Sequence, residues 1–228
     1  MITPGEEDFI RNYAYVPEHL PGYGTAISEG EPFLLENYLC YWGKESLIFI
    51  GYPLQEPFEA TKTEKILEGA IERFRPCRVA LIAPAISRRD GERRDPDVYY
   101  KLDLAGLQVQ SKVKNMIQRA SRELEVEKGR EFGKEHRHLI TDFLESRQVS
   151  EGLRYIFEKI PKYLSAVPTA WLFGARTRAG RLAGFDIAEY GAKNYAFYMF
   201  NFRSRQDPVP GTSDFLLHEL LKEARQQG

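Results

Sequence analysis

The C-terminal stretch Arg181–Gly228 constrains the fold most strongly, because its apolar residues change from one periodicity to another. Residues 182–190 and 195–202 are rich in aromatic and aliphatic side chains that favour strands, and Gly191 and Asn194 between them favour a turn. After a loop, leucines recur at helical spacing over Ser213–Gln226. The stretch therefore predicts a β-hairpin followed by a helix that packs on it. We expect Tyr195–Phe202 to be a central strand with strictly alternating burial, which places Tyr195, Phe197, Met199 and Asn201 on one face.

The loop and the helix start suggest an anion site. Thr212, Ser213 and Asp214 are good capping residues, and the first N–H groups of a helix have no partner within it. These groups point beyond the second strand, where the positive end of the helix dipole favours a negative charge. Gly211 has no Cβ, so it lets the backbone approach a ligand closely.

A hairpin that leads through a loop into such a helix resembles the centre of the GNAT acyltransferase fold. The segment PGTSDFLLHELLKEARQQG is most similar to Fem-type aminoacyltransferases and to the soluble domain of phosphatidylglycerol lysyltransferases. The resemblance implies that Gly211, Thr212 and Ser213 hold the donor, which is acyl-coenzyme A or an aminoacyl-tRNA. Ordinary GNAT proteins carry Gln/Arg-x-x-Gly-x-Gly/Ala at this turn. Arg205–Gly211 departs from that pattern, so we expect coenzyme A to bind weakly or not at all.

The N-terminal half predicts three strands, a helix and a fourth strand. The first two strands are expected at Gly24–Ser28 and Phe33–Cys40, in a hairpin around Gly30–Glu31, and the third at Ser46–Gly51. The helix is expected to begin at Thr63 and to end before Pro76, and the fourth strand is expected at Arg78–Ala83. The third and fourth strands are expected to be buried. Residues 1–22 show no clear period.

The C-terminal half predicts the order β-α-β-α-α-β-β-β-α. A strand is expected at Tyr99–Leu104, a helix that begins at Ser111, a strand at Glu125–Glu131, and two helices at Lys134–Arg147 and Gln148–Tyr163. A hairpin of Ala170–Thr177 with Arg181–Tyr190 then leads into the C-terminal stretch described above. We therefore expect an α/β protein with two GNAT-like halves, 1–97 and 98–228, each with a mixed sheet and flanking helices. A GNAT module normally continues with more strands, so either another segment supplies them or the second half is truncated at its C-terminus.

Transfer of an acyl group needs a base for the acceptor and a proton donor for the leaving group. Tyr198 is the candidate proton donor, and Asp186 and Glu189 are the candidate bases. The two carboxylates lie on opposite faces of their predicted strand, so at most one of them faces the cleft. The alternatives are a packing role for Tyr198 and solvated strand charges for Asp186 and Glu189.

Basic residues on the helix after Ser111 are the candidate substrate-binding groups. Fem-type proteins carry spaced basic residues on such a helix, and the resemblance implies that Lys112, Lys114 and Arg119 meet phosphate of a nucleotide-linked substrate or of tRNA. An ordinary solvated surface is the alternative. The arginines of the Arg88–Arg94 loop offer a second basic patch, but interspersed acids make a solvated loop or linker the favoured interpretation. The net charge of −1 argues against general nucleic-acid binding.

The sequence argues against a disulfide, a metal site, a secretory signal and a membrane-spanning segment. Cys40 and Cys77 lie in apolar contexts typical of two buried thiols rather than a disulfide, and His136 and His138 point to different faces of a helix, so no metal site is expected. The chain has no signal-peptide pattern and no apolar run of membrane-spanning length, which predicts a cytoplasmic protein.

The resemblance thus predicts transfer of an acyl or aminoacyl group to an amine or hydroxyl acceptor. The acceptor would be a small molecule, a lipid or a peptidoglycan precursor. The alternative is a catalytically silent GNAT-like module that binds a partner. Aromatic side chains that fill the space between the last strand and the last helix would favour the silent module.

Overall fold

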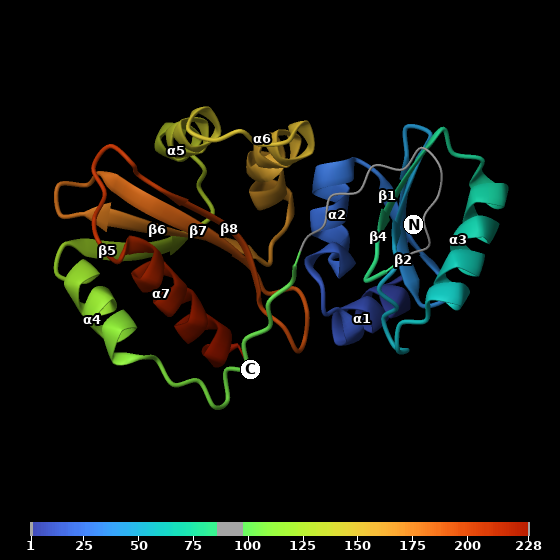
Figure 1. Ribbon diagram of the computed structural model, residues 1–228, viewed down its shortest axis with the longest axis horizontal. Helices are drawn as coiled ribbons and strands as arrows, with labels where there is room; N and C mark the ends of the chain where they lie inside the picture. Colours follow the sequence, from blue (N-terminus) through green and yellow to red (C-terminus); the bar gives the residue numbers. More distant parts are fainter. Residues whose placement is uncertain (1, 86–97, 228) are drawn as a thin grey trace. The chain divides into compact units, whose positions relative to one another are not determined.

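The computed structural model describes residues 2–85 and 98–227, which form two compact units, each built on one sheet (Figure 1). The first unit takes Met1–Lys101 and Ala192–Tyr195, and the second takes Leu102–Gly191 and Ala196–Gly228. Each sheet has four strands, and the predicted α/β fold with two halves is confirmed. No helix in the described part is long and apolar enough to cross a membrane.

The first unit has the sheet order β1-β2-β3-β4, antiparallel except for the parallel pair β3–β4. Its elements are α1 (Pro4–Tyr13), a 3-10 turn η1 (Pro17–His19), α2 (Pro21–Ser28), β1 (Glu31–Leu35), β2 (Tyr38–Gly43), β3 (Ser46–Ile50), α3 (Ala60–Phe74) and β4 (Arg78–Ile82). Helix α3 covers one face of the sheet, where Leu67 and Ala70 pack against Leu47 and Phe49. The other face packs on the N-terminal region through Ile10, Val16 and other apolar side chains.

Two predictions for the first unit are wrong, and one helix was not predicted. Gly24–Ser28 belongs to helix α2, and the hairpin instead joins β1 to β2. Residues 4–13, which show no clear period, form α1, because Thr3 and Glu6 make a reciprocal capping box and Pro4 occupies the first turn. Strand β4 lies at the correct position but is largely exposed, because it is the outer strand of its sheet.

The second unit has the fully antiparallel sheet order β5-β6-β7-β8, so its sheet is not mixed. Its elements are α4 (Ser111–Ala120), β5 (Leu124–Gly129), α5 (Lys134–Glu145), α6 (Glu151–Ala166), β6 (Ala170–Thr177), β7 (Leu182–Glu189), β8 (Phe197–Arg203) and α7 (Thr212–Gln226). Helices α4 and α7 cover one face and α5 and α6 the other (Figure 1). The leucine stripe of α7 is buried as predicted, with Leu216 and Leu220 in the core.

Strand β8 departs from the prediction in two ways. It is the outer strand of its sheet, not a central one. Its pairing with β7 also shifts, because Ile187 pairs with Phe200 while Ala188 pairs with Tyr198, which leaves Met199 as an extra residue, a β-bulge. The strict alternation therefore fails after Met199, and Phe200 is buried on the same side as Phe197.

The remaining predictions have mixed outcomes. The hairpin of β6 and β7 and the two consecutive helices α5 and α6 are confirmed, although α6 continues past Pro161 to Ala166. Tyr99–Leu104 forms no strand. Cys40 is buried, but Cys77 is exposed, and both are free thiols. The Arg88–Arg94 loop lies outside the described residues.

Candidate functional site

Three polar side chains of neighbouring strands lie on the α7 face of the second sheet, and the bulge at Met199 brings one of them, Tyr198, to that face. Asp186 pairs with Asn201 and the adjacent Ala188 pairs with Tyr198, so all of these residues point to one side. The Asn201 side-chain amide donates to Asp186 Oδ1 over 2.5 Å. Two predicted site residues, Asp186 and Tyr198, thus lie together, and Asn201 joins them.

Asp186 is a buried carboxyl group with one incompletely satisfied oxygen. Its side chain is 0% exposed, and burial raises its pKa to about 7, although the Asn201 amide and the Tyr198 hydroxyl oppose that rise. Oδ2 has no hydrogen-bond partner of good geometry among the described residues. The Tyr198 hydroxyl therefore provides a weaker electrostatic contact rather than a full hydrogen bond.

Tyr198 remains a protonated phenol beside this carboxyl group. Burial of its ring and the neighbouring Asp186 both raise the pKa of Tyr198 above its usual value. The residue as a whole is 45% exposed, so part of the side chain reaches solvent. The pair thus combines a carboxyl group that titrates near neutral pH with a phenol that keeps its proton.

The start of α7 lies next to this cluster but differs from the predicted anion site. The Ser213 hydroxyl donates to Asn201 Oδ1 over 3.5 Å, so Ser213 contacts the cluster. Thr212 is buried, and its hydroxyl donates to the Val209 carbonyl. Gly211, not Thr212 or Asp214, is the N-cap residue, and no side chain caps the helix.

Gly211 is needed for packing inside the protein. Its φ of 85° lies in the left-handed region, and a Cβ there would lie 2.4 Å from the Met116 carbonyl oxygen of α4. The absence of a Cβ at Gly211 therefore allows its backbone to pack closely on α4. A bulky residue at this position would disturb the fold.

Glu189 lies on the opposite face of β7, as the predicted alternation requires. It is 1% exposed, and its carboxylate accepts hydrogen bonds from the Tyr163 hydroxyl (2.5 Å) and from the Thr169 hydroxyl. Burial raises the pKa of Glu189, while these two donors and nearby Arg130 oppose the rise. This carboxylate ties α6 and the 167–169 turn to the sheet.

The three candidate substrate-binding residues are exposed on α4. Lys112, Lys114 and Arg119 all point to solvent. In the described part of the chain, no hydrogen bond or ion pair joins them to Asp186 or Tyr198. Helix α4 nevertheless packs against α7 and contacts Gly211 at the start of that helix.

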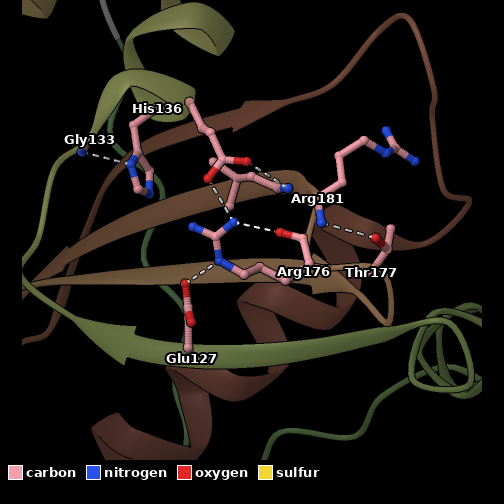
Figure 2. Close-up of polar contacts among 9 residues, drawn as sticks. Glu127, Gly133, His136, Arg176, Thr177 and Arg181 are labelled. Atoms are coloured by element: carbon pink, nitrogen blue, oxygen red, sulfur yellow. Dashed lines mark hydrogen bonds and ion pairs between the residues drawn. The ribbon is translucent and has the colours of Figure 1, made fainter.

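A separate polar cluster surrounds Arg176 at the hairpin end of the sheet (Figure 2). The Arg176 guanidinium donates to Glu127 Oε1 (2.6 Å) and to Glu135 Oε2 (2.8 Å), and these bonds raise the pKa of Arg176 and lower that of Glu135. This cluster was not predicted from the sequence, and its only signal there is the occurrence of opposite charges on neighbouring strands. The guanidinium is engaged by two carboxylates, which is typical of a structural role.

His136 lies in the first turn of α5, beside that cluster. Its Nδ1 accepts from the Gly133 N–H over 3.0 Å (Figure 2), and its ring lies edge to face with Phe185. His136 is 5% exposed, whereas the His138 side chain is 63% exposed, so the two histidines do point to different faces. Among residues 2–85 and 98–227, no group of three or more His, Cys, Asp or Glu side chains is placed to hold a metal ion.

Two surface hollows of the second unit lie away from the Asp186 cluster. One, of about 320 Å³, lies between α5 and α6, and the other, of about 350 Å³, lies beside Arg176 and Arg178. Neither includes a residue of β8 or α7. Asp186 is 0% exposed, so a ligand that reaches it needs local movement of the side chains that cover it.

The comparisons with known proteins rest on structure. No family model and no curated protein matches the sequence. The fold is similar to that of L-PGS from Bacillus licheniformis, at 15% identity over 99% of this chain and 73% of that chain, with a TM-score of 0.57. It is also similar to the C-terminal domain (DUF2156) of a putative lysylphosphatidylglycerol synthetase from Agrobacterium fabrum, at 16% identity over 97% and 76%, with a TM-score of 0.55.

A third similar structure is a conserved protein of unknown function from Bacteroides thetaiotaomicron VPI-5482, at 12% identity over 99% of this chain and 86% of that chain, with a TM-score of 0.57. Together these likenesses confirm the predicted GNAT-like fold, shared with the lysylphosphatidylglycerol synthetase domain over nearly the whole chain. At such identities they establish the fold alone.

Proposed function

We propose that this chain transfers an acyl or aminoacyl group to an amine or hydroxyl acceptor. The observation that carries the proposal is the Asp186–Asn201–Tyr198 cluster, built at a strand bulge beside the first turn of α7. The shared fold with lysylphosphatidylglycerol synthetase structures supports the same chemistry. By analogy with their name, a lysyl group and phosphatidylglycerol are the first donor group and acceptor to test.

The cluster suits the proton transfers of this reaction. A carboxyl group with a pKa of about 7 can accept a proton from the acceptor amine or hydroxyl near neutral pH. The Tyr198 phenol, which keeps its proton, can donate to the leaving oxygen of the donor. Asn201 holds the carboxyl group in place through its hydrogen bond to Oδ1. Glu189, bonded to Tyr163 and Thr169 on the other face, supports the strand in this scheme.

An aminoacyl-tRNA donor fits the chain better than coenzyme A. The Arg205–Gly211 loop lacks the GNAT pyrophosphate pattern, and Gly211 packs on α4. Ser213 remains available at the helix start, and Lys112, Lys114 and Arg119 offer exposed positive charge on α4. Replacing these three basic residues with glutamine should reduce both donor affinity and its salt dependence, because fewer phosphate charges are neutralised.

The direct test is a transfer assay with the full chain, labelled lysyl-tRNA and phosphatidylglycerol vesicles, followed by a tRNA pool charged with other amino acids. We expect label in the acceptor fraction, and a loss of about 100-fold or more in rate for Asp186→Asn and for Tyr198→Phe. The exposed Asp207→Asn serves as the matched control. Transfer at an unchanged rate in both site variants would remove these residues from the mechanism.

A silent binding module is the second candidate, and a specific observation favours it. Asp186 is fully buried, and neither surface hollow reaches β8 or α7. Absence of transfer from every charged tRNA and from acetyl-coenzyme A, in a folded preparation, would support this candidate over the transferase.

A further inference from the structure

A hollow of about 320 Å³ lies between α5 and α6, on the face of the second sheet opposite Asp186. Its volume is near the lower end of the range for small-ligand pockets, roughly 300–1,000 Å³, which suits a ligand of one amino-acid unit. The floor is apolar and consists of Phe132, Ile140, Leu144, Phe157 and Pro161.

Charged side chains of both signs surround this floor. Arg137 and Glu145 extend from α5, and Arg154 and Glu158 extend from α6. All four are exposed, and in the described part of the chain none of them forms a hydrogen bond or an ion pair through its side chain. The Arg137 guanidinium lies 5.4 Å from the centre of the Phe132 ring, so it is held over the floor.

The backbone of α6 adds an acceptor to the hollow. Pro161 lies inside the helix, which continues to Ala166. Proline has no N–H, so the carbonyl of Phe157, four residues earlier, lacks its helical hydrogen bond. Phe157 and Pro161 both line the hollow, and this carbonyl can therefore accept from a bound N–H group.

We propose that the hollow binds a free, zwitterionic α-amino acid with an apolar side chain. The apolar side chain lies on the floor, the carboxylate is bound by Arg137 and Arg154, and the amino group is bound by Glu158 and the Phe157 carbonyl. Two unpaired charges of each sign around an apolar floor match this ligand better than a purely anionic or cationic one. The site is independent of the proposed transfer reaction, because it lies on the other face of the sheet.

The test is titration of the full chain with L-leucine, followed through backbone amide signals by NMR. Saturable shifts in α5 and α6 are expected. Arg137→Gln and Arg154→Gln each remove one carboxylate donor from an exposed position, and each should weaken leucine binding about tenfold or more. The matched control is Arg122→Gln, an exposed arginine just after α4, which should bind leucine like the parent. Circular dichroism of each variant checks the fold.

Related ligands test whether both charged groups are needed. Leucine amide lacks the carboxylate and N-acetyl-leucine lacks the ammonium group, so both should bind more weakly than leucine. Glycyl-leucine and leucyl-glycine each replace one charged group of the leucine unit by a neutral amide, so both should also bind more weakly than leucine. No saturable shift with leucine overturns the proposal, as does tighter binding of either dipeptide or equal affinity in the parent and both arginine variants.

Discussion

Asn201 on β8 donates its side-chain amide to Asp186 on β7 over 2.5 Å, and a bulge in β8 adds Tyr198 to this pair. Tyr198 and Asn201 are three positions apart, so strict alternation would place them on opposite faces of the strand. The extra residue at Met199 brings Tyr198 to the face that carries Asp186 and Asn201. One inserted position in the ladder thus assembles the candidate site.

The buried Asp186 should make the second unit less stable as pH rises. Burial raises its pKa from the ordinary 3.8 to about 7, so the folded state holds a proton that the unfolded state releases in that range. This stabilising contribution is complete below about pH 4 and is lost as pH rises through 7, by up to about 1.4 kcal/mol per pH unit. In Asp186→Asn the free energy of unfolding should fall less steeply in this window than in the parent, because Glu189, whose pKa burial also raises, is still present.

Urea unfolding from pH 5 to 8 measures this effect. The two tryptophans, Trp42 and Trp171, lie one in each unit, so Trp171 fluorescence in a Trp42→Phe background reports the second unit. The exposed Asp207→Asn is the control, and it should retain the pH dependence of the parent. The same slope in Asp186→Asn and the parent would contradict the assignment.

Loss of Asn201 should raise the pKa of Asp186 further. The Asn201 amide lowers this pKa by donating to the carboxylate, so in Asn201→Ala the charged form loses its main donor. Titration of carbon-13-labelled aspartate carboxyl groups by NMR measures the change. Ser213→Ala is the control, because Ser213 contacts Asn201 and not the carboxylate. A pKa that stays near 7 in Asn201→Ala would show that the hydrogen bond does not stabilise the ionised form.

The sequence predicted the second unit well because its elements are long and strongly periodic. The leucine stripe of α7 and the hairpin at Gly180 identify their elements without tertiary information. The bulge was not predictable, because Met199 differs from a regular strand residue only in its pairing with β7. The partnership of Asp186, Asn201 and Tyr198 depends on that pairing, so it was missed although two of its members were named.

The other differences between prediction and structure, in both units, have different causes. Helix α2 is short and begins at Pro21, and its glycines weaken the helical pattern, so part of it was predicted as a strand. The outer position of β4 and β8 depends on which strands pair, which local patterns do not encode. The role of Gly211 also required the structure, because the chain shows the glycine but not the Met116 carbonyl that it accommodates.

His19 should make the first unit less stable in acid. It is 0% exposed, its Nδ1 accepts from the Tyr15 N–H (3.4 Å), and its Nε2–H donates to the Tyr52 carbonyl (2.8 Å), which fixes a neutral ring. Burial lowers its pKa from 6.5 to about 4. The unfolded state therefore binds the proton first, so stability is complete above about pH 6.5 and falls by up to about 1.4 kcal/mol per pH unit as pH decreases to 4.

Trp42 fluorescence in a Trp171→Phe background reports this unit during urea unfolding between pH 4 and 7. His19→Gln should have a flatter pH dependence, although it is less stable at neutral pH. His138→Gln, at an exposed position of the second unit, should leave the slope unchanged. A parent protein whose first unit is equally stable at pH 4.5 and 6.5 would rule out a neutral buried histidine.

Gly211 and Gly180 provide a matched pair for separating backbone conformation from packing. Their φ angles are 85° and 83°, so alanine at either position must adopt a left-handed backbone, at a cost of about 1–2 kcal/mol. They differ in their surroundings, since a Cβ on Gly180 meets nothing within 4 Å, whereas one on Gly211 lies 2.4 Å from the Met116 carbonyl oxygen. Gly211→Ala should therefore destabilise the second unit by about 2–5 kcal/mol in total, because α4 must shift as well.

The difference between the two variants in urea unfolding, followed by Trp171 fluorescence, isolates the packing contribution. Equal losses would mean that α4 and α7 do not meet at this glycine, and would restore Gly211 as a residue free to approach a ligand.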